Sequence, residues 1–205
     1  MKYNFLAVLA CLPCVSMAHP YIAVTTDIAV APSGANSADI TITWTYEEAF
    51  SLVLLGELGI DPLDSLTRDD AHNLQSYVTG WPEGFEGDLY ILDGDRSTLL
   101  GDSESRRNHT VDVVAGQIVE QFVRTIPTNN ATLIVQNYDP FFVTDYTIQS
   151  AVATQGCTAV LLKADRAAAQ AKLDALIAQM PEDTVEMAFP EVGIEFADAV
   201  SIGCD

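Results

Sequence analysis

His19 and a few carboxylates are the residues of this sequence best suited to bind a metal ion. If a leader peptide ends at Ala18, the α-amine and the imidazole of His19 lie on the same residue and can together chelate a transition metal. Further ligands would come from Glu47, Glu48 or Asp139. The sequence therefore predicts a site for zinc, nickel, cobalt or copper, and the alternative is an ordinary exposed N-terminal histidine.

The first eighteen residues have the order of features typical of a signal peptide. Lys2 provides a positive charge, residues 5–15 are apolar, and Ser16-Met17-Ala18 is a small-x-small cleavage site. We therefore expect residues 1–18 to be removed and residues 19–205 to form one domain of the exported protein. Two alternatives are a buried N-terminal helix and lipid attachment at Cys11.

Two cysteines, Cys157 and Cys204, remain after removal of the signal peptide. In an exported chain such a pair most simply forms a disulfide bond. The alternative is a thiolate metal site, which the oxidising compartment disfavours.

The charge of the chain excludes several classes of partner. Nine Lys and Arg residues stand against 29 Asp and Glu residues, giving a formal charge of −20. A protein that binds nucleic acid or an anionic membrane surface needs clustered basic residues, so neither is an expected partner of this chain. Beyond the signal peptide, the apolar segment at residues 49–60 is too short to cross a membrane and contains Glu57.

No strong catalytic motif is present, and we expect the protein not to be an enzyme. The sequence lacks G-x-S-x-G, H-E-x-x-H and a phosphate-binding loop. A hydrolase that pairs Glu47 or Glu48 with Asp139 is the enzymatic alternative. We interpret His72 and His109 as surface residues.

Four acidic residues flank the start of the second expected helix, and a calcium loop is the alternative interpretation of this segment. Asp61, Asp64, Asp69 and Asp70 lack the alternating spacing of such a loop, and Pro62 follows the first. We interpret this segment as a helix start, with Asp64, Ser65 or Thr67 as the cap.

The elements that must position these residues are mostly strands. Period-2 alternation predicts a strand pair within residues 22–46 and strands at 88–92, 110–114, 117–124, 131–138, 141–148, 157–162 and 199–204. Helices are expected at 48–58, 67–78 and 165–180. The predicted fold is α+β, with a mainly antiparallel, sandwich-like sheet core, an early helical insertion and a C-terminal helix packed on the sheet.

Several segments, in order along the chain, resemble one family. They are His19-Pro20-Tyr21, residues 44–51 (WTYEEAFS), residues 138–143 (YDPFFV), Cys157, and the end from residues 193–198 (GIEFAD) to Cys204. The family consists of uncharacterised bacterial periplasmic proteins described as components of an ABC-type transport system. Its members are often encoded beside nickel and cobalt transporters, and one branch is implicated in zinc use.

The resemblance implies a periplasmic, non-enzymatic accessory of divalent-metal transport, with an inner-membrane transporter as partner. Three features depart from the family pattern. Tyr21 stands where the family commonly has a second histidine, the calcium-like Asp and Gly segment is reduced to scattered aspartates, and histidine-rich stretches are absent. A protein-interaction or structural β-module without a metal role is the alternative function.

Overall fold

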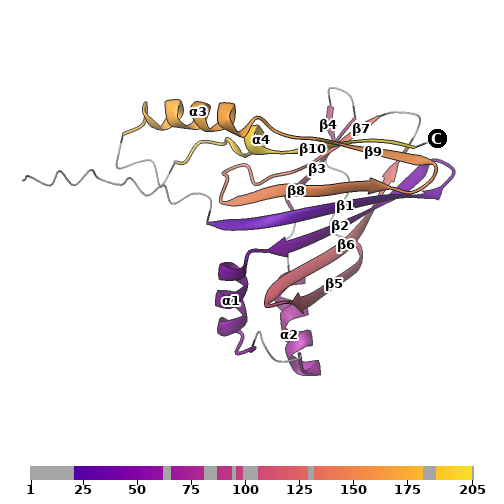
Figure 1. The fold of residues 1–205 in the computed structure, drawn as a ribbon, viewed down its shortest axis with the longest axis vertical. Coiled ribbons are helices and arrows are strands. Elements are labelled where there is room, and N and C mark those ends of the chain that lie inside the picture. The colour runs from indigo at the N-terminus through magenta and orange to yellow at the C-terminus, as the bar shows by residue number, and fades with distance from the viewer. Residues whose placement is uncertain are drawn as a thin grey trace, which may run out of the picture.

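The computed structural model describes residues 21–61, 66–80, 87–93, 96–98, 106–128, 132–181 and 188–204. Two five-stranded sheets make up about half of these residues, and four helices accompany them, so the chain has the mainly β, α+β class that the sequence predicts (Figure 1). His19 and the predicted signal peptide lie outside the described residues.

Sheet A has the strand order β5-β6-β2-β1-β8. Its strands are β1 (Ile22–Gly34), β2 (Ser37–Tyr46), β5 (Arg107–Val114), β6 (Gln117–Pro127) and β8 (Thr144–Ala153). The strand pairs β1–β2, β2–β6 and β5–β6 are antiparallel, whereas β1 and β8 are parallel. The expected β1–β2 hairpin is confirmed, and in β2 the buried residues alternate with more exposed polar ones.

Sheet B has the order β4-β3-β7-β10-β9 and is antiparallel throughout. Its strands are β3 (Leu89–Asp93), β4 (Arg96–Thr98), β7 (Leu133–Asn137), β9 (Cys157–Leu162) and β10 (Ala199–Cys204). The last two strands have the bounds predicted from the sequence.

One hydrophobic cluster draws on both sheets and forms the largest core. Sheet A contributes residues such as Ile28, Ile42 and Trp44, and sheet B contributes Val135 and Ile202, all of them buried. Burial of such side chains is the main favourable term in folding. The two sheets are therefore held together by apolar contact, within which any polar group needs a partner.

The early helices α1 (Glu48–Glu57) and α2 (Arg68–Thr79) lie on one side of the molecule, and α3 (Arg166–Ile177) and α4 (Gly193–Phe196) lie on the other (Figure 1). Thr67 caps α2 through a capping box with Asp70, as one of the sequence interpretations expected. Gln75 of α2 also hydrogen-bonds the backbone of β5 at His109 O and Val111 N, which covers that sheet edge.

The C-terminal helix packs through a third cluster. Ala169 and Leu173 of α3 contact Phe142, Val192 and Phe196, and the rings of Phe142 and Phe196 stack with centroids 4.0 Å apart. These contacts place α3 beside α4 and the segment before β8. Its packing across the sheet itself stays a prediction.

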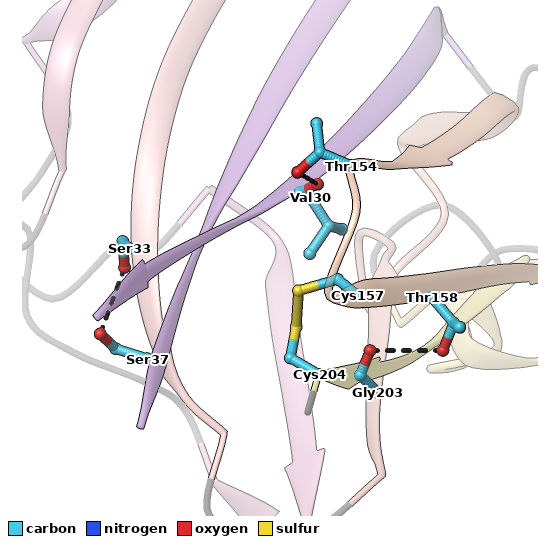
Figure 2. Close-up of a disulfide and its surroundings, with 8 residues drawn as sticks. All are labelled: Val30, Ser33, Ser37, Thr154, Cys157, Thr158, Gly203 and Cys204. Atoms are coloured by element: carbon cyan, nitrogen blue, oxygen red, sulfur yellow. Dashed lines mark hydrogen bonds between the residues drawn. A yellow bond between two sulfur atoms is a disulfide. The ribbon is translucent and has the colours of Figure 1, made fainter. Parts of the chain in front are cut away.

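The predicted disulfide bond joins Cys157 at the start of β9 to Cys204 at the end of β10 (Figure 2). The two residues are direct partners in the antiparallel register, with Cα atoms 4.0 Å apart. The bond therefore ties the edge strand of sheet B to the end of the described chain.

Candidate functional site

The start of β1 lies between two of the segments that carry the family resemblance. On one side, the N–H of Ala23 donates to Glu47 Oε1 (3.1 Å), and the N–H of Glu47 donates to the carbonyl of Ala23 (2.9 Å). On the other side, the N–H of Tyr21 donates to the carbonyl of Val143 (2.9 Å). We call this part of the molecule the β1 entry region: residues 21–23, Glu47, Glu48 and residues 139–143.

Glu47 and Glu48 mark the junction between β2 and α1. Glu47 is the N-cap residue, although its side chain makes no capping bond and instead holds the start of β1. Glu48 is exposed in the first turn of the helix, where a negative charge complements the helix dipole. Both carboxylates therefore lie at the β1 entry region, and Glu48 faces solvent.

Asp139 organises the turn that precedes β8. Its Oδ1 accepts a hydrogen bond from the N–H of Phe141 (2.9 Å), and its Oδ2 accepts bonds from Val143 (3.0 Å) and Thr144 (3.1 Å). A carboxylate that accepts several backbone bonds in this way fixes the loop around it. The hydrolase alternative gains no support from these contacts, because both Asp139 and Glu47 are held by backbone N–H groups.

The strand predicted at 141–148 is wrong at its first three residues, which belong to this turn. The strand begins only at Thr144, because Asp139 binds the N–H groups of residues 141, 143 and 144 and Phe142 adopts a left-handed conformation with φ of 54°. Residues 141–143 therefore leave the extended conformation that their apolar character predicts.

The C-terminal segment of the resemblance reaches the same place. The N–H of Gly193 donates to the carbonyl of Pro140 (3.0 Å), and a Cβ atom at position 193 would lie 1.7 Å from the carbonyl oxygen of Asp139. Only glycine allows this approach of two backbones. Asp198, further along, accepts bonds from Ile148 N (3.0 Å), Lys163 Nζ (2.9 Å) and Ala164 N (3.0 Å).

A buried side-chain amide, two residues before Asp139 in the chain, connects the two sheets. Asn137 of β7 is 1% exposed, and its Oδ1 accepts from Trp44 Nε1 (2.8 Å) and Thr26 Oγ1 (3.2 Å) of sheet A. Its Nδ2 donates to the carbonyls of Gly87 (3.3 Å) and Asp88 (2.8 Å). Asn137 thus connects the WTYEEAFS segment of β2 to residues immediately before β3.

Asp88 lies next to this amide and has an unusual environment. Its backbone is left-handed, with φ of 50°, and its Oδ2 accepts a hydrogen bond from the hydroxyl of Tyr146 on β8 (3.2 Å). Burial raises the pKa of the Asp88 carboxyl to about 7, the negative charge of Asp139 adds to this rise, and the Tyr146 bond opposes it. A carboxyl that titrates near neutral pH is a candidate functional group.

A second polar group is buried between β2, β5 and β6. Glu120 of β6 is fully buried, with Oε2 accepting from the hydroxyl of Tyr46 (2.8 Å) and Oε1 lying 2.5 Å from His109 Nε2. Burial, followed by the charge of Glu120, raises the pKa of Tyr46 well above its usual value. The surface interpretation of His109 is wrong, since its side chain is only 14% exposed and lies against this carboxylate.

The sequence contains one signal for this group that no catalytic or metal-binding motif includes. Glu120 lies on the inward face of β6, between the buried residues Ile118 and Phe122, where a charged residue needs a partner. The β5–β6 hairpin supplies one, because Val111 is the register partner of Glu120 and His109 lies two residues before it.

Within the described residues, no three His, Cys, Asp or Glu side chains gather as metal ligands. The chain matches a family model described as "Protein of unknown function (DUF1007)" over residues 4–204, and it belongs to this family. No curated protein matches the chain. None of the described helices has the length and apolar character needed to span a membrane.

Proposed function

We propose that the protein is a periplasmic, non-enzymatic accessory of a divalent transition-metal transport system. In this proposal it binds zinc, nickel, cobalt or copper at the β1 entry region and acts with an inner-membrane metal transporter of the ABC-type class. The observation that carries the proposal is the meeting of the family-like segments: the WTYEEAFS, YDPFFV and GIEFAD segments are joined there by backbone hydrogen bonds.

The ligand set follows from chain connectivity. His19 is two residues before Tyr21, and two residues span at most about 7 Å, so the amine and imidazole of a processed N-terminus come within reach of this region. Glu47 and Glu48 lie beside the start of β1. Asp139 already accepts three backbone bonds, so its part is to hold the region in shape. A nitrogen-rich chelate completed by carboxylate suits a borderline divalent metal.

The test is calorimetric titration of untagged, signal-processed protein with each of the four metals. We expect one ion per chain, and we expect His19→Ala to weaken binding by at least about tenfold, the scale of a change at a metal site. His72→Ala is the matched control, because His72 is exposed on α2 and should leave the affinity unchanged. Absence of binding for all four metals, or unchanged affinity in His19→Ala, contradicts the proposal.

A protein-interaction module is the second candidate, and one observation favours it. Tyr21, Phe141 and Ile194 are large apolar residues that are 56%, 47% and 48% exposed, and all three adjoin the 139–143 turn. Exposed apolar residues of this kind often mark a protein contact. Co-purification with a membrane transporter that survives metal chelation and is lost in Phe141→Ser would select this function over metal binding.

A further inference from the structure

The two sheets have four edges, and three of these edges are blocked. At the β5 edge of sheet A, Gln75 of α2 bonds the backbone of the strand. At the β8 edge, charged side chains bond the backbone of Ile148: Asp198 accepts from its N–H, and Lys163 donates to its carbonyl. The β4 edge of sheet B is only three residues long. Covering elements, charged side chains and short strands all keep sheet edges from pairing with other chains.

The fourth edge, strand β9 (Cys157–Leu162), has none of these protections. It pairs with β10 in an antiparallel register without a bulge, and it contains no charged residue. Its first residue is held to β10 by the disulfide bond with Cys204 (Figure 2). Within the part of the chain that the structure describes, the backbone of residues 158–162 bonds to no element other than β10. The strand is therefore fixed on one side and available for pairing on the other.

The burial of side chains along β9 agrees with an open edge. Ala159 and Leu161 face the core but are only partly buried, whereas Val200 of β10, the register partner of Leu161, is 0% exposed. On the outward face, Val160 and Leu162 are 54% and 47% exposed. Large apolar side chains thus lie in solvent beside unpaired backbone groups, a combination that favours the addition of another strand.

The charge of the chain indicates which strand fits this edge. Each chain has a formal charge of −20, so two copies repel each other wherever their acidic surfaces meet. Residues 146–162, which include β9 and most of β8, contain no Asp, Glu, Lys or Arg. Two copies that meet at β9 therefore bring no like charges together. Since both copies have the same edge, one antiparallel contact about a two-fold axis closes both.

We propose that β9 pairs with β9 of a second copy, which joins the two five-stranded B sheets into one continuous sheet of a two-fold symmetric dimer. Antiparallel pairing places residues of the same face opposite one another. The register centred on Val160 packs this residue against its own copy and sets Leu162 opposite Thr158. This inference goes beyond the proposed function, because it requires neither a metal ion nor a transporter.

Sedimentation velocity of the exported, oxidised protein, in the presence of a chelator, tests the dimer. A strand of six residues is about 20 Å long, and one such strand pair buries less than the roughly 1,200 Å² of a standard stable interface. We therefore expect a dimer that dissociates on dilution, with monomer at low micromolar and dimer at high micromolar concentration. A wild-type chain that stays monomeric at every concentration would overturn the proposal.

A charge at position 160 should abolish the dimer. In Val160→Lys two like charges meet at the two-fold axis, which destabilises a strand pair, and a lysine on an edge strand opposes pairing in general. Because Val160 is 54% exposed, the melting temperature of the monomer should stay near that of the wild type. Val114→Lys is the matched control: Val114 is also 54% exposed, but it lies at the end of β5, and this variant should dimerise like the wild type.

A mixture of charge variants identifies the partner of β9. Val160→Lys and Val160→Glu should each be monomeric, and their equimolar mixture should recover the dimer, because opposite charges then face each other across the axis. Dimerisation that persists in Val160→Lys would overturn the proposal. A mixture that stays monomeric would also overturn it, and would leave the edge to a strand of another protein.

Discussion

Replacing Asn137 by alanine tests how the two sheets are joined. The substitution removes the acceptor of two buried donors, Trp44 Nε1 and Thr26 Oγ1, whose residues are 1% and 0% exposed. It also removes the donor to the Gly87 and Asp88 carbonyls. An unsatisfied buried group costs about 1–3 kcal/mol, so the expected loss in the free energy of unfolding is about 3–5 kcal/mol.

Urea and thermal unfolding, monitored by circular dichroism, measure this loss. For a chain of this size 1 kcal/mol corresponds to about 2–4 °C, so the melting temperature should fall by about 6–20 °C. Gln136→Ala, at the partly exposed neighbouring position of the same strand, is the matched control and should change stability by about 0.5 kcal/mol or less.

A double-mutant cycle isolates the bond between the sheets. Combining Asn137→Ala with Trp44→Phe should give a coupling energy within the range of about 0.5–3 kcal/mol seen for contacting residues. Asn137 does not join the two sheets in this way if Asn137→Ala costs about the same as Gln136→Ala, or if the changes at Asn137 and Trp44 are additive.

Two further predictions concern the disulfide bond and the close backbone approach at Gly193. Replacing Cys157 and Cys204 by serine removes a disulfide bond between residues 47 positions apart, so the free energy of unfolding should fall by about 4 kcal/mol in the chain-entropy model. Urea unfolding measures this loss against the oxidised wild type. An unchanged unfolding midpoint contradicts the prediction. Gly193→Ala should destabilise the fold strongly, because its Cβ would overlap the carbonyl of Asp139, whereas Gly56→Ala in α1 meets no atom within 4 Å and should stabilise by up to about 1 kcal/mol. Similar melting temperatures for the two glycine variants would argue against the close approach at Gly193.

Strands whose pairing is local could be predicted from the sequence, whereas their non-local arrangement could not. The alternation along residues 39–47 and the turn before it identify the β1–β2 hairpin, and short apolar runs identify β9 and β10. The parallel pairing of β1 with β8 depends on residues more than a hundred positions apart, and no local pattern specifies it. The turn at 139–143 was missed because one carboxylate outweighs the strand propensity of an apolar segment.

In the candidate site, too, local features could be predicted from the sequence and non-local contacts could not. Glu47 and Glu48 lie where the strand pair predicted within 22–46 gives way to the helix predicted at 48–58, and the structure places them at this junction, beside the start of β1. The roles of Asp88 and Glu120 depend on burial by strands distant in sequence, so their types alone did not single them out. Glu120 has one local signal, a charge at an inward position of an alternating strand, whereas Asp88 has none.

Native mass spectrometry of the untagged, exported protein tests the central claim most directly, because it reports the N-terminus and the bound metal together. We expect the mass of residues 19–205 with the disulfide bond formed, plus one divalent transition-metal ion that is lost in His19→Ala and kept in His72→Ala. A chain that begins elsewhere, or a processed chain that carries no such ion after exposure to zinc, nickel, cobalt and copper, would contradict it.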